Sequence, residues 1–221
     1  MFDAVLFDFD GLILDTETPD YQSWCEVFEA HGCELPLAVW SQAVGVPAGA
    51  FDECGYLVSQ LGRTVEREPI RRARQERFYA LVSEQSLRDG VREALDAALL
   101  LELRIGIASS ADRKWIEGHL EHHGIRDRFE AIRCRDDVRR AKPDPEVYLA
   151  AADALGVDPA RALVFEDSPN GIQAAKRAGM TCVAVPNSVT MHLDLSAADM
   201  VIASLGEMSL NAIMEELGER R

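Results

Sequence analysis

Two aspartates interrupt an apolar stretch near the start of the chain. Residues 5–15 read V-L-F-D-F-D-G-L-I-L-D, so Asp8 and Asp10 end a run of β-forming residues and Gly11 follows them. Burying an unpaired carboxylate is costly. Because alternate residues of an extended strand point to the same side, the two carboxylates are expected to share one face. Such a pair requires a compensating cation, and later segments supply candidates.

Polar residues again stand where later apolar segments end. These residues are Ser109 and Ser110, Lys142, and Glu166 and Asp167. Taken singly, each has an ordinary explanation, since a serine before a helix is often an N-cap and a lysine is often solvated. The carboxyl ends of parallel strands, however, meet at one edge of a sheet, where ligands bind in open α/β folds. Their common position after strands therefore favours a single site.

The four acidic residues among these candidates would crowd a small space. Uncompensated carboxylates raise one another's pKa values and destabilise the fold. A hard divalent cation resolves the conflict, and Mg²⁺ suits a site with few protein carboxylates together with water and substrate oxygens. A metal next to Lys142, a serine hydroxyl and helix N-terminal amides forms a phosphate site. The sequence therefore predicts a Mg²⁺ site that holds a phosphorylated ligand.

The elements that must position these residues alternate between short apolar strands and helices. Such alternation indicates a parallel sheet with helices on both faces, a doubly wound α/β core. The predicted strands are 3–9, 103–108, 131–134, 162–166, 181–185 and 200–203. The predicted helices of this core are 91–101, 111–123, 144–155 and 169–178.

Residues 16–85 break this alternation. They contain amphipathic segments, such as 20–31 and 69–82, without a convincing buried strand. We therefore expect a core domain of residues 1–15 and 86–221, with a helical cap domain of residues 16–85 inserted after the first strand. The hinges are expected near 15–17 and 85–89.

Composition limits the kind of partner. With 48% hydrophobic residues the chain can bury a core, and its net charge of −15 opposes binding to nucleic acid or anionic lipid. The five cysteines are odd in number and form no C-x-x-C, which indicates reduced thiols. The first residues lack a basic segment, and no apolar run approaches the ~18 residues of a membrane span. We expect a cytoplasmic protein without an obligate protein partner.

The motifs together resemble those of the haloacid dehalogenase-like hydrolase superfamily. The matching segments, in the order that this family uses, are D-F-D-G-L-I-L-D-T-E (8–17), Ser109 in I-A-S-S, Lys142 in A-K-P-D-P, and E-D-S-P-N-G (166–171). The sequence is similar to the phosphatase and β-phosphoglucomutase branch, which has a Rossmann-like core and a small helical cap after the first motif.

The resemblance implies a role for each matching position. Asp8 would attack phosphorus and form an aspartyl-phosphate, while Asp10 would protonate the leaving oxygen and then deprotonate the attacking water. The implied metal ligands are Asp8, the Asp10 backbone carbonyl and Asp167, with Glu166 holding ligand waters or assisting. The implied phosphate-binding groups are Ser109, Lys142 and the Ser110 amide.

The resemblance also separates the possible reactions. True dehalogenases of the superfamily lack an aspartate at the position of Asp10, so dehalogenation is not expected. The similar mutases carry a histidine where Asp20 stands and an arginine just past the pair Gly45-Val46, where this chain has P-A-G-A at 47–50. Both departures favour hydrolysis of a small phosphorylated metabolite, of the sugar phosphate or phosphoglycolate type. A β-phosphoglucomutase-like mutase and a catalytically silent metal- or phosphate-binding regulatory module remain alternatives.

Three further features have ordinary structural interpretations. Six arginines between residues 63 and 77 alternate with glutamates and are expected on a solvated helix face. His119 and His123 have the spacing of metal ligands on a helix, but no acidic third ligand accompanies them, so a helix surface is expected. Trp24 and Trp40 are expected in the core of the cap.

Overall fold

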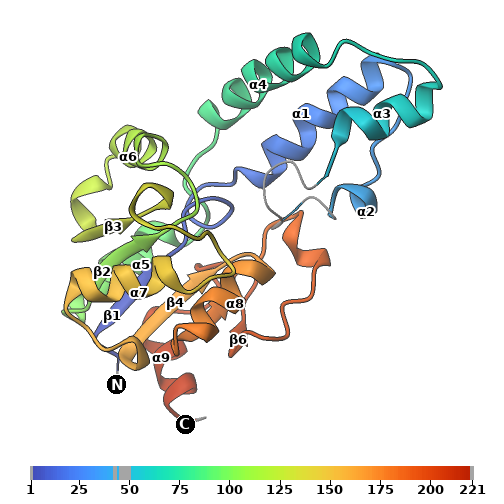
Figure 1. Cartoon of the computed structure of the whole chain (residues 1–221). Coiled ribbons are helices and arrows are strands. Elements are labelled where there is room, and N and C mark those ends of the chain that lie inside the picture. Colours follow the sequence, from blue (N-terminus) through green and yellow to red (C-terminus); the bar gives the residue numbers. More distant parts are fainter. Residues whose placement is uncertain (1, 42–43, 45–50, 220–221) are drawn as a thin grey trace.

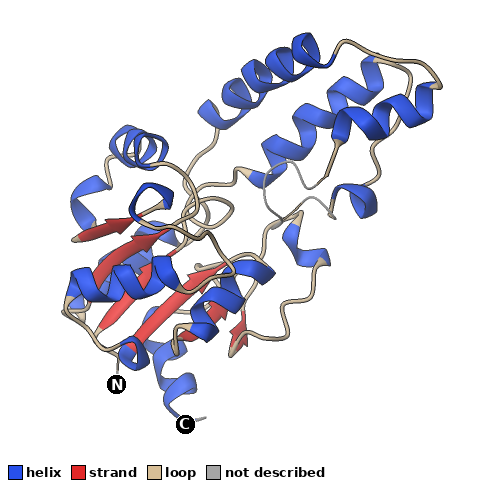
Figure 2. Cartoon of the chain, in the orientation of Figure 1, coloured by secondary structure: helices blue, strands red, loops and turns tan. Residues whose placement is uncertain are grey.

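The computed structural model describes residues 2–41, 44 and 51–219, and its centre is a parallel β-sheet (Figures 1 and 2). Within the described residues the sheet has six strands in the order β3-β2-β1-β4-β5-β6. The strands are β1 (Ala4–Phe7), β2 (Arg104–Ala108), β3 (Ala131–Arg133), β4 (Ala162–Glu166), β5 (Thr181–Ala184) and β6 (Met200–Val201). The predicted strands and the predicted doubly wound α/β fold are confirmed, with strand ends that shift by one or two residues.

Helices cover both faces of this sheet because side chains along a strand alternate between the faces. Val5 and Phe7 pack on one face with residues of three helices, and Ala4 and Leu6 pack on the other face with residues of two. The helices of the first face are α5 (Val91–Leu100), α6 (Arg113–His122) and α9 (Leu210–Glu219), and those of the second are α7 (Glu146–Leu155) and α8 (Pro169–Arg177).

The chain between β1 and α5 forms a separate helical body beside the sheet (Figure 1). Its helices are α1 (Glu17–Ala30), α2 (Leu37–Trp40), α3 (Glu53–Leu61) and α4 (Arg67–Ser83). Trp24, Phe28, Trp40 and Leu57 form an apolar cluster of their own here, so the two tryptophans lie in the interior of this body as expected. No helix within the described part of the chain is long and apolar enough to cross a membrane.

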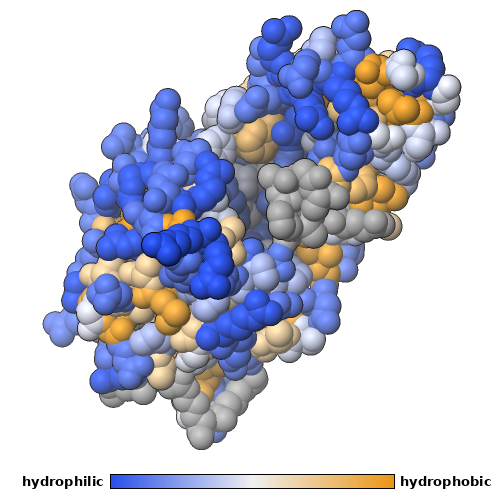
Figure 3. All heavy atoms as spheres, in the orientation of Figure 1, coloured by the Kyte–Doolittle hydropathy of each residue, from blue (hydrophilic) through white to orange (hydrophobic). Residues whose placement is uncertain are grey.

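Five of the six arginines between residues 63 and 77 are exposed, as expected for a solvated face. The space-filling view shows hydrophilic residues over most of this side of the molecule (Figure 3). Arg74 differs, because it is largely buried between α4 and α1. Its guanidinium pairs with Asp20 and lies over the rings of Trp24 and Phe78, at 5.4 and 5.0 Å from their centroids. Burial lowers the pKa of Arg74 to about 10.

Candidate active site

Asp8 and Asp10 lie just beyond the end of β1. The backbone N–H of Asp8 still donates to the carbonyl of Phe165 on β4, at 3.0 Å, but the strand itself ends at Phe7. The chain then turns, since the N–H groups of residues 12–14 all donate to the Phe9 carbonyl. The expectation that one extended strand carries both aspartates is therefore wrong. Asp8 keeps one hydrogen bond to the neighbouring strand β4, whereas Asp10 lies in the turn that follows β1.

Gly11 allows that turn to approach the neighbouring loops. Its φ of +75° lies in the left-handed region, and a Cβ at this position would overlap the side chains of Asp167 and Asn187. The Gly11 carbonyl accepts hydrogen bonds from Arg88 and Asn187. Arg88 also donates to the carbonyls of Val185 and Pro186, so it ties the β1 turn to the loop after β5.

Lys142 lies between two of the predicted carboxylates. Its Nζ donates to Asp8 Oδ1 at 2.7 Å and to Glu166 Oε1 at 2.6 Å, and the side chain is only 7% exposed. Burial by itself lowers the pKa of Lys142, but the two carboxylates outweigh it and raise the pKa above its ordinary value. Lys142 therefore remains an ammonium group at neutral pH and holds a positive charge against Asp8.

Both carboxylate oxygens of Glu166 are occupied by protein donors. Besides Lys142, Oε1 accepts from the buried hydroxyl of Tyr148 at 2.7 Å. Oε2 accepts from the backbone N–H groups of Asp167 and Ser168 and from the Ser168 hydroxyl. A side chain at Gly171 would collide with this carboxylate, which explains the glycine in the first turn of α8. Glu166 is completely buried, and its contacts fix the position of Lys142.

Asp8, Glu166 and Asp167 form a group of acidic residues that could hold a metal ion. One oxygen from each lies within 4.8 Å of the other two. Burial raises the pKa of Asp8 to about 7, although Lys142 opposes this effect. Burial, with Glu166 and Asp8 nearby, raises the pKa of Asp167 well above its ordinary value. A cation would relieve this repulsion, and the all-oxygen donor set fits a hard divalent cation such as Mg²⁺.

Asn187, in the loop after β5, orients Asp167. Its Oδ1 accepts from the backbone N–H groups of Val189 and Thr190, both at 3.0 Å. This fixes the amide so that Nδ2 must face Asp167 Oδ2, to which it donates at 2.8 Å. Asn187, Tyr148 and Arg88 were not predicted from the sequence, because their roles depend on partners from distant segments and no local motif marks them.

The structure places Ser109 at the same edge of the sheet as Asp8. β2 is the neighbour of β1, with Ile107 in register with Phe7, and Ser109 follows the end of β2. The Ser109 side chain is buried, and its Oγ accepts from the Ala111 N–H at 3.0 Å. Ser110 is exposed at the start of the turn into α6. Asp8, Ser109 and Asp167 thus directly follow strands at this edge, and Glu166 is the last residue of β4. Lys142 reaches the same place from the segment between β3 and α7.

Asp10 borders a cavity of about 330 Å³ between the sheet edge and helices α1 and α4. Trp115 on α6 donates from its indole Nε1 to Asp10 Oδ1 at 2.8 Å. Burial raises the pKa of Asp10, although hydrogen bonds from Trp115 and Thr16 oppose this effect. Burial, with Asp10 nearby, raises the pKa of Glu17, also in the cavity wall, to about 7. Asp20, which like Glu17 lies in the first turn of α1, extends this acidic wall.

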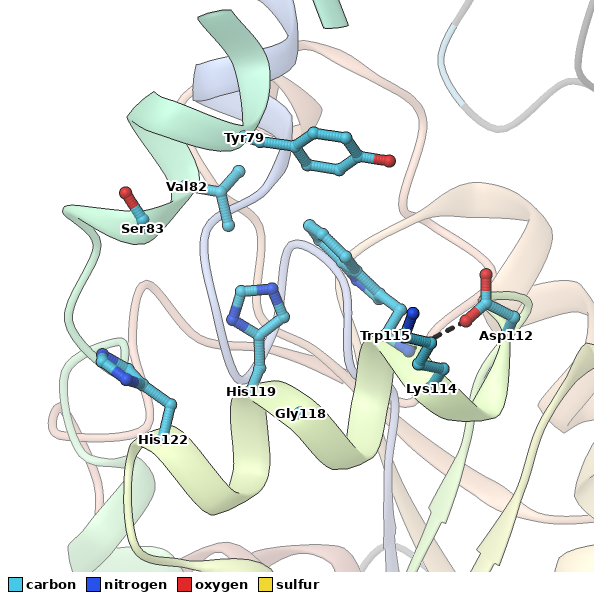
Figure 4. Close-up of a pocket in the computed structure, with 9 residues that line it drawn as sticks. All are labelled: Tyr79, Val82, Ser83, Asp112, Lys114, Trp115, Gly118, His119 and His122. Atoms are coloured by element: carbon cyan, nitrogen blue, oxygen red, sulfur yellow. Dashed lines mark hydrogen bonds between the residues drawn. The ribbon is translucent and has the colours of Figure 1, made fainter. Parts of the chain in front are cut away.

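A larger cavity of about 680 Å³ lies on the other side of Trp115, between α4 and α6 (Figure 4). Among the described residues, its lining includes Tyr79, Val82 and His119 but not the carboxylates or the lysine that surround Asp8. His119 is half-buried against the Trp115 ring, with the centroids 4.3 Å apart, so the expectation of a plain surface position is wrong for it. The larger hollow therefore lies apart from the candidate chemistry.

The fold and the site define a class of protein. It is a doubly wound α/β enzyme in which carboxylates and a buried lysine meet at the carboxyl edge of the sheet, beside a helical body. The chain belongs to the haloacid dehalogenase-like hydrolases, since the model of that family matches residues 5–185. This confirms the resemblance noted in the sequence.

Similar proteins support the assignment as a phosphatase. YhcW, a candidate phosphatase of Bacillus subtilis (strain 168), is 48% identical over 220 residues that span both chains completely. Validoxylamine A 7'-phosphate phosphatase of Streptomyces hygroscopicus subsp. limoneus is 32% identical, covering 94% of this chain and 96% of the relative. A β-phosphoglucomutase structure from Clostridium difficile aligns with a TM-score of 0.76 and 25% identity, covering 100% of this chain and 99% of the other. The protein is a phosphatase of this family.

Proposed function

We propose that the protein is a Mg²⁺-dependent phosphatase that hydrolyses a small phosphorylated metabolite through an aspartyl-phosphate on Asp8. The observation that carries the proposal is the buried contact of Lys142 with Asp8, at 2.7 Å, beside the acidic group of Asp8, Glu166 and Asp167. A buried lysine next to carboxylates offers positive charge for a phosphoryl group, and the carboxylates offer oxygen ligands for a metal.

The metal would be held by Asp8, the Asp10 backbone carbonyl and Asp167. When bound, it would offset negative charge on the transferring phosphoryl group. Asn187 keeps Asp167 oriented toward the acidic group through the bond to Oδ2. Glu166 has both oxygens on protein donors, so we assign it to positioning Lys142 rather than to direct metal ligation.

The reacting phosphoryl group would be bound by Lys142, Ser109 and the Ser110 amide. Asp8 attacks phosphorus, and the bond from phosphorus to the leaving oxygen breaks as Asp10 donates its proton to that oxygen. Asp10 then accepts a proton from the water that hydrolyses the aspartyl-phosphate. This order requires Asp10 to be protonated first, and its burial, which raises its pKa, supports that requirement.

The cavity beside Asp10 supports a substrate that is rich in hydroxyl groups. Carboxyl groups of Asp10, Glu17, Asp20 and Asp112 line it, together with Arg135 and the rings of Phe78 and Tyr79. Carboxyl groups accept hydrogen bonds from hydroxyl groups, and four of them against one arginine leave the wall net acidic, which disfavours a second anionic group. A sugar phosphate therefore fits this cavity better than phosphoglycolate does. The similarity to a protein of Thermotoga maritima named as a phosphorylated carbohydrates phosphatase, 28% identical over 218 residues, supports the same substrate class.

We also propose that residues 16–85 act as a cap on a core of residues 1–15 and 86–221. The two connections between α1–α4 and the sheet contain the predicted hinges near 15–17 and 85–89. Closure of the cap would exclude bulk water during the attack by Asp8. A cytoplasmic location belongs to the same proposal and is supported by the five free cysteines.

A phosphosugar mutase is the second candidate, because the chain resembles β-phosphoglucomutase in fold. Against it, Asp20 stands at the position of the mutase histidine and pairs with Arg74. The segment after Gly45-Val46, where the mutases carry an arginine, lies outside the described residues. Incubation with a sugar monophosphate and its bisphosphate separates the two, since free phosphate indicates a phosphatase and an isomerised sugar phosphate a mutase.

The decisive variant is Asp8→Asn, which removes the nucleophile and keeps the shape of the side chain. We expect phosphate release from a panel of phosphate esters to fall below detection, with an unchanged circular dichroism spectrum. Asp153→Asn, at an exposed position on α7, is the matched control and should retain full activity. Chelation of divalent cations should abolish turnover, and added Mg²⁺ should restore it. Full activity of Asp8→Asn would contradict the mechanism.

A further inference from the structure

Trp115 is the described side chain of α6 that reaches the proposed acid of the reaction. Its Nε1 lies 2.8 Å from Asp10 Oδ1, a normal length for a hydrogen bond from an indole. The position of Trp115 along α6 is fixed by the start of that helix. Asp112 is its N-cap residue, and the Asp112 carboxylate accepts the backbone N–H of Trp115 at 2.8 Å (Figure 4).

The indole ring of Trp115 is packed between α6 and the cap helix α4. It stacks on Phe78, with centroids 5.9 Å apart and planes inclined by 18°, and it also contacts Tyr79 at 5.8 Å. On its own helix it meets the edge of His119. Figure 4 shows Trp115 and His119 projecting from α6 toward Tyr79 and Val82 of α4. One side chain thus contacts both the cap and Asp10.

The chemistry of the indole group determines what this contact can do. An indole N–H donates a hydrogen bond and cannot accept one. Asp10 Oδ1 therefore acts as the acceptor, and the proton of a protonated Asp10 is favoured on the other carboxyl oxygen. A leaving-group acid must present its proton within hydrogen-bond reach of the leaving oxygen. The contact with Trp115 thus occupies Oδ1 and favours the second oxygen for that task, while Thr16 also hydrogen-bonds to this carboxyl group.

We propose that Trp115 is a positioning residue for Asp10: its indole N–H holds Oδ1, and its stack on Phe78 makes that placement depend on the position of cap helix α4. This inference rests on the proposed phosphatase function and adds a residue to it. Trp115 does not touch the phosphoryl group in this scheme and acts only through Asp10.

The role of Trp115 can be tested with two substrates whose leaving groups differ in how much they need protonation by an acid. We compare Trp115→Phe, which keeps an aromatic ring but removes the N–H, with the unaltered protein on two substrates at saturating Mg²⁺. An alkyl sugar phosphate has a poor leaving group and requires protonation, whereas p-nitrophenyl phosphate has a good leaving group and does not. We expect kcat/KM for the alkyl ester, which reports the steps up to departure of the leaving group, to fall about threefold to tenfold, as for a lost hydrogen bond to a neutral carboxyl group. We expect kcat/KM for p-nitrophenyl phosphate to change by less than about twofold.

Two further variants act as controls. Trp40→Phe makes the same chemical change in the cap core, where the indole nitrogen has no hydrogen-bond partner among the described residues, and should change kcat/KM for neither substrate. Phe78→Leu keeps the Trp115 N–H but removes the stacked ring. Because Phe78 also lines the cavity, the readout is the ratio of the two kcat/KM values, and the alkyl ester should lose a few-fold more than p-nitrophenyl phosphate.

The outcomes separate this inference from the proposed function. Equal losses of kcat/KM on both substrates in Trp115→Phe would indicate a structural role only and would overturn the positioning role, as would no loss of kcat/KM on either. If Phe78→Leu left kcat/KM for the alkyl ester unchanged while Trp115→Phe lowered it, the role would be limited to the hydrogen bond, and the proposed dependence on the cap helix would be overturned. If the unaltered protein released no phosphate from any ester, the phosphatase proposal itself would fail, and the inference with it.

Discussion

Charged side chains at the carboxyl edge of the sheet are buried in ion pairs, whereas most of those on the cap helices are exposed to solvent. At the edge, Lys142 is buried between Asp8 and Glu166, and each of these groups has a fixed partner. On the cap, Arg77 and Glu26 form an ion pair with both side chains about 40% exposed (43% and 38%). Removing buried charges from water is expensive, whereas exposed pairs contribute little. Substitutions at the sheet edge should therefore have much larger effects than equivalent ones on the cap.

The largest expected effect is at Lys142. In Lys142→Ala, Asp8 and Glu166 lose their shared cation and remain buried beside Asp167. We expect phosphatase activity to fall below detection and the free energy of unfolding, measured by urea titration without metal, to fall by roughly 3–5 kcal/mol.

Lys176→Ala is the matched control for Lys142. Lys176 pairs with Asp199 at the surface, at 2.6 Å, with side chains 36% and 35% exposed. Its loss should lower the free energy of unfolding by no more than about 1 kcal/mol and leave activity unchanged. Similar destabilisation in the two variants would remove the contrast between buried and exposed charge.

A second contrast compares two glycines with similar backbone geometry. Gly11 at the sheet edge has φ +75°, and Gly32 after α1 has φ +70°. A Cβ at Gly11 would overlap Asp167 and Asn187, whereas a Cβ at Gly32 would meet nothing within 4 Å. Gly32→Ala should cost about 1 kcal/mol of unfolding free energy, and Gly11→Ala about 2–5 kcal/mol because steric overlap adds to backbone strain.

The two glycine variants should also differ in how their phosphatase activity depends on the Mg²⁺ concentration. Gly11→Ala displaces the Asp167 carboxylate, so we expect the Mg²⁺ concentration for half-maximal phosphate release to rise about tenfold or more. Gly32→Ala should not change it. An unaltered Mg²⁺ dependence in Gly11→Ala would show that Asp167 is not a metal ligand.

The smallest effect is expected within the cap, at Arg74. Arg74→Met removes the pair with Asp20 and the contacts over the Trp24 and Phe78 rings. We expect a loss of about 1 kcal/mol in unfolding free energy, measured by thermal denaturation. Arg77→Met, on the exposed face of the same helix, should have no measurable effect. Equal changes of unfolding free energy in the two variants would show that Arg74 contributes no more to stability than the exposed arginines do.

Much of the fold follows from local sequence patterns. The strands at 162–166 and 181–185 were predicted within one residue, because short apolar runs bounded by polar residues and glycine are typical of parallel strands. Helix ends agree less well: α1 begins at Glu17, three residues before the predicted 20–31. The first strand was predicted over residues 3–9 but ends at Phe7, because the turn that follows depends on Gly11 meeting the loops after β4 and β5.

The sequence by itself determined which residues stand at the ends of strands: Asp8, Ser109 and Glu166 follow apolar runs that can only form a buried sheet. It could not determine what holds them. The contact of Trp115 with Asp10 joins residues 105 positions apart, and that of Lys142 with Asp8 joins residues 134 apart. Periodicity and capping act over a few residues, whereas such distant pairs exist only once both faces of the sheet and the cap have packed. For that reason the tertiary structure decided the partners of each reactive group, including the indole that holds Asp10.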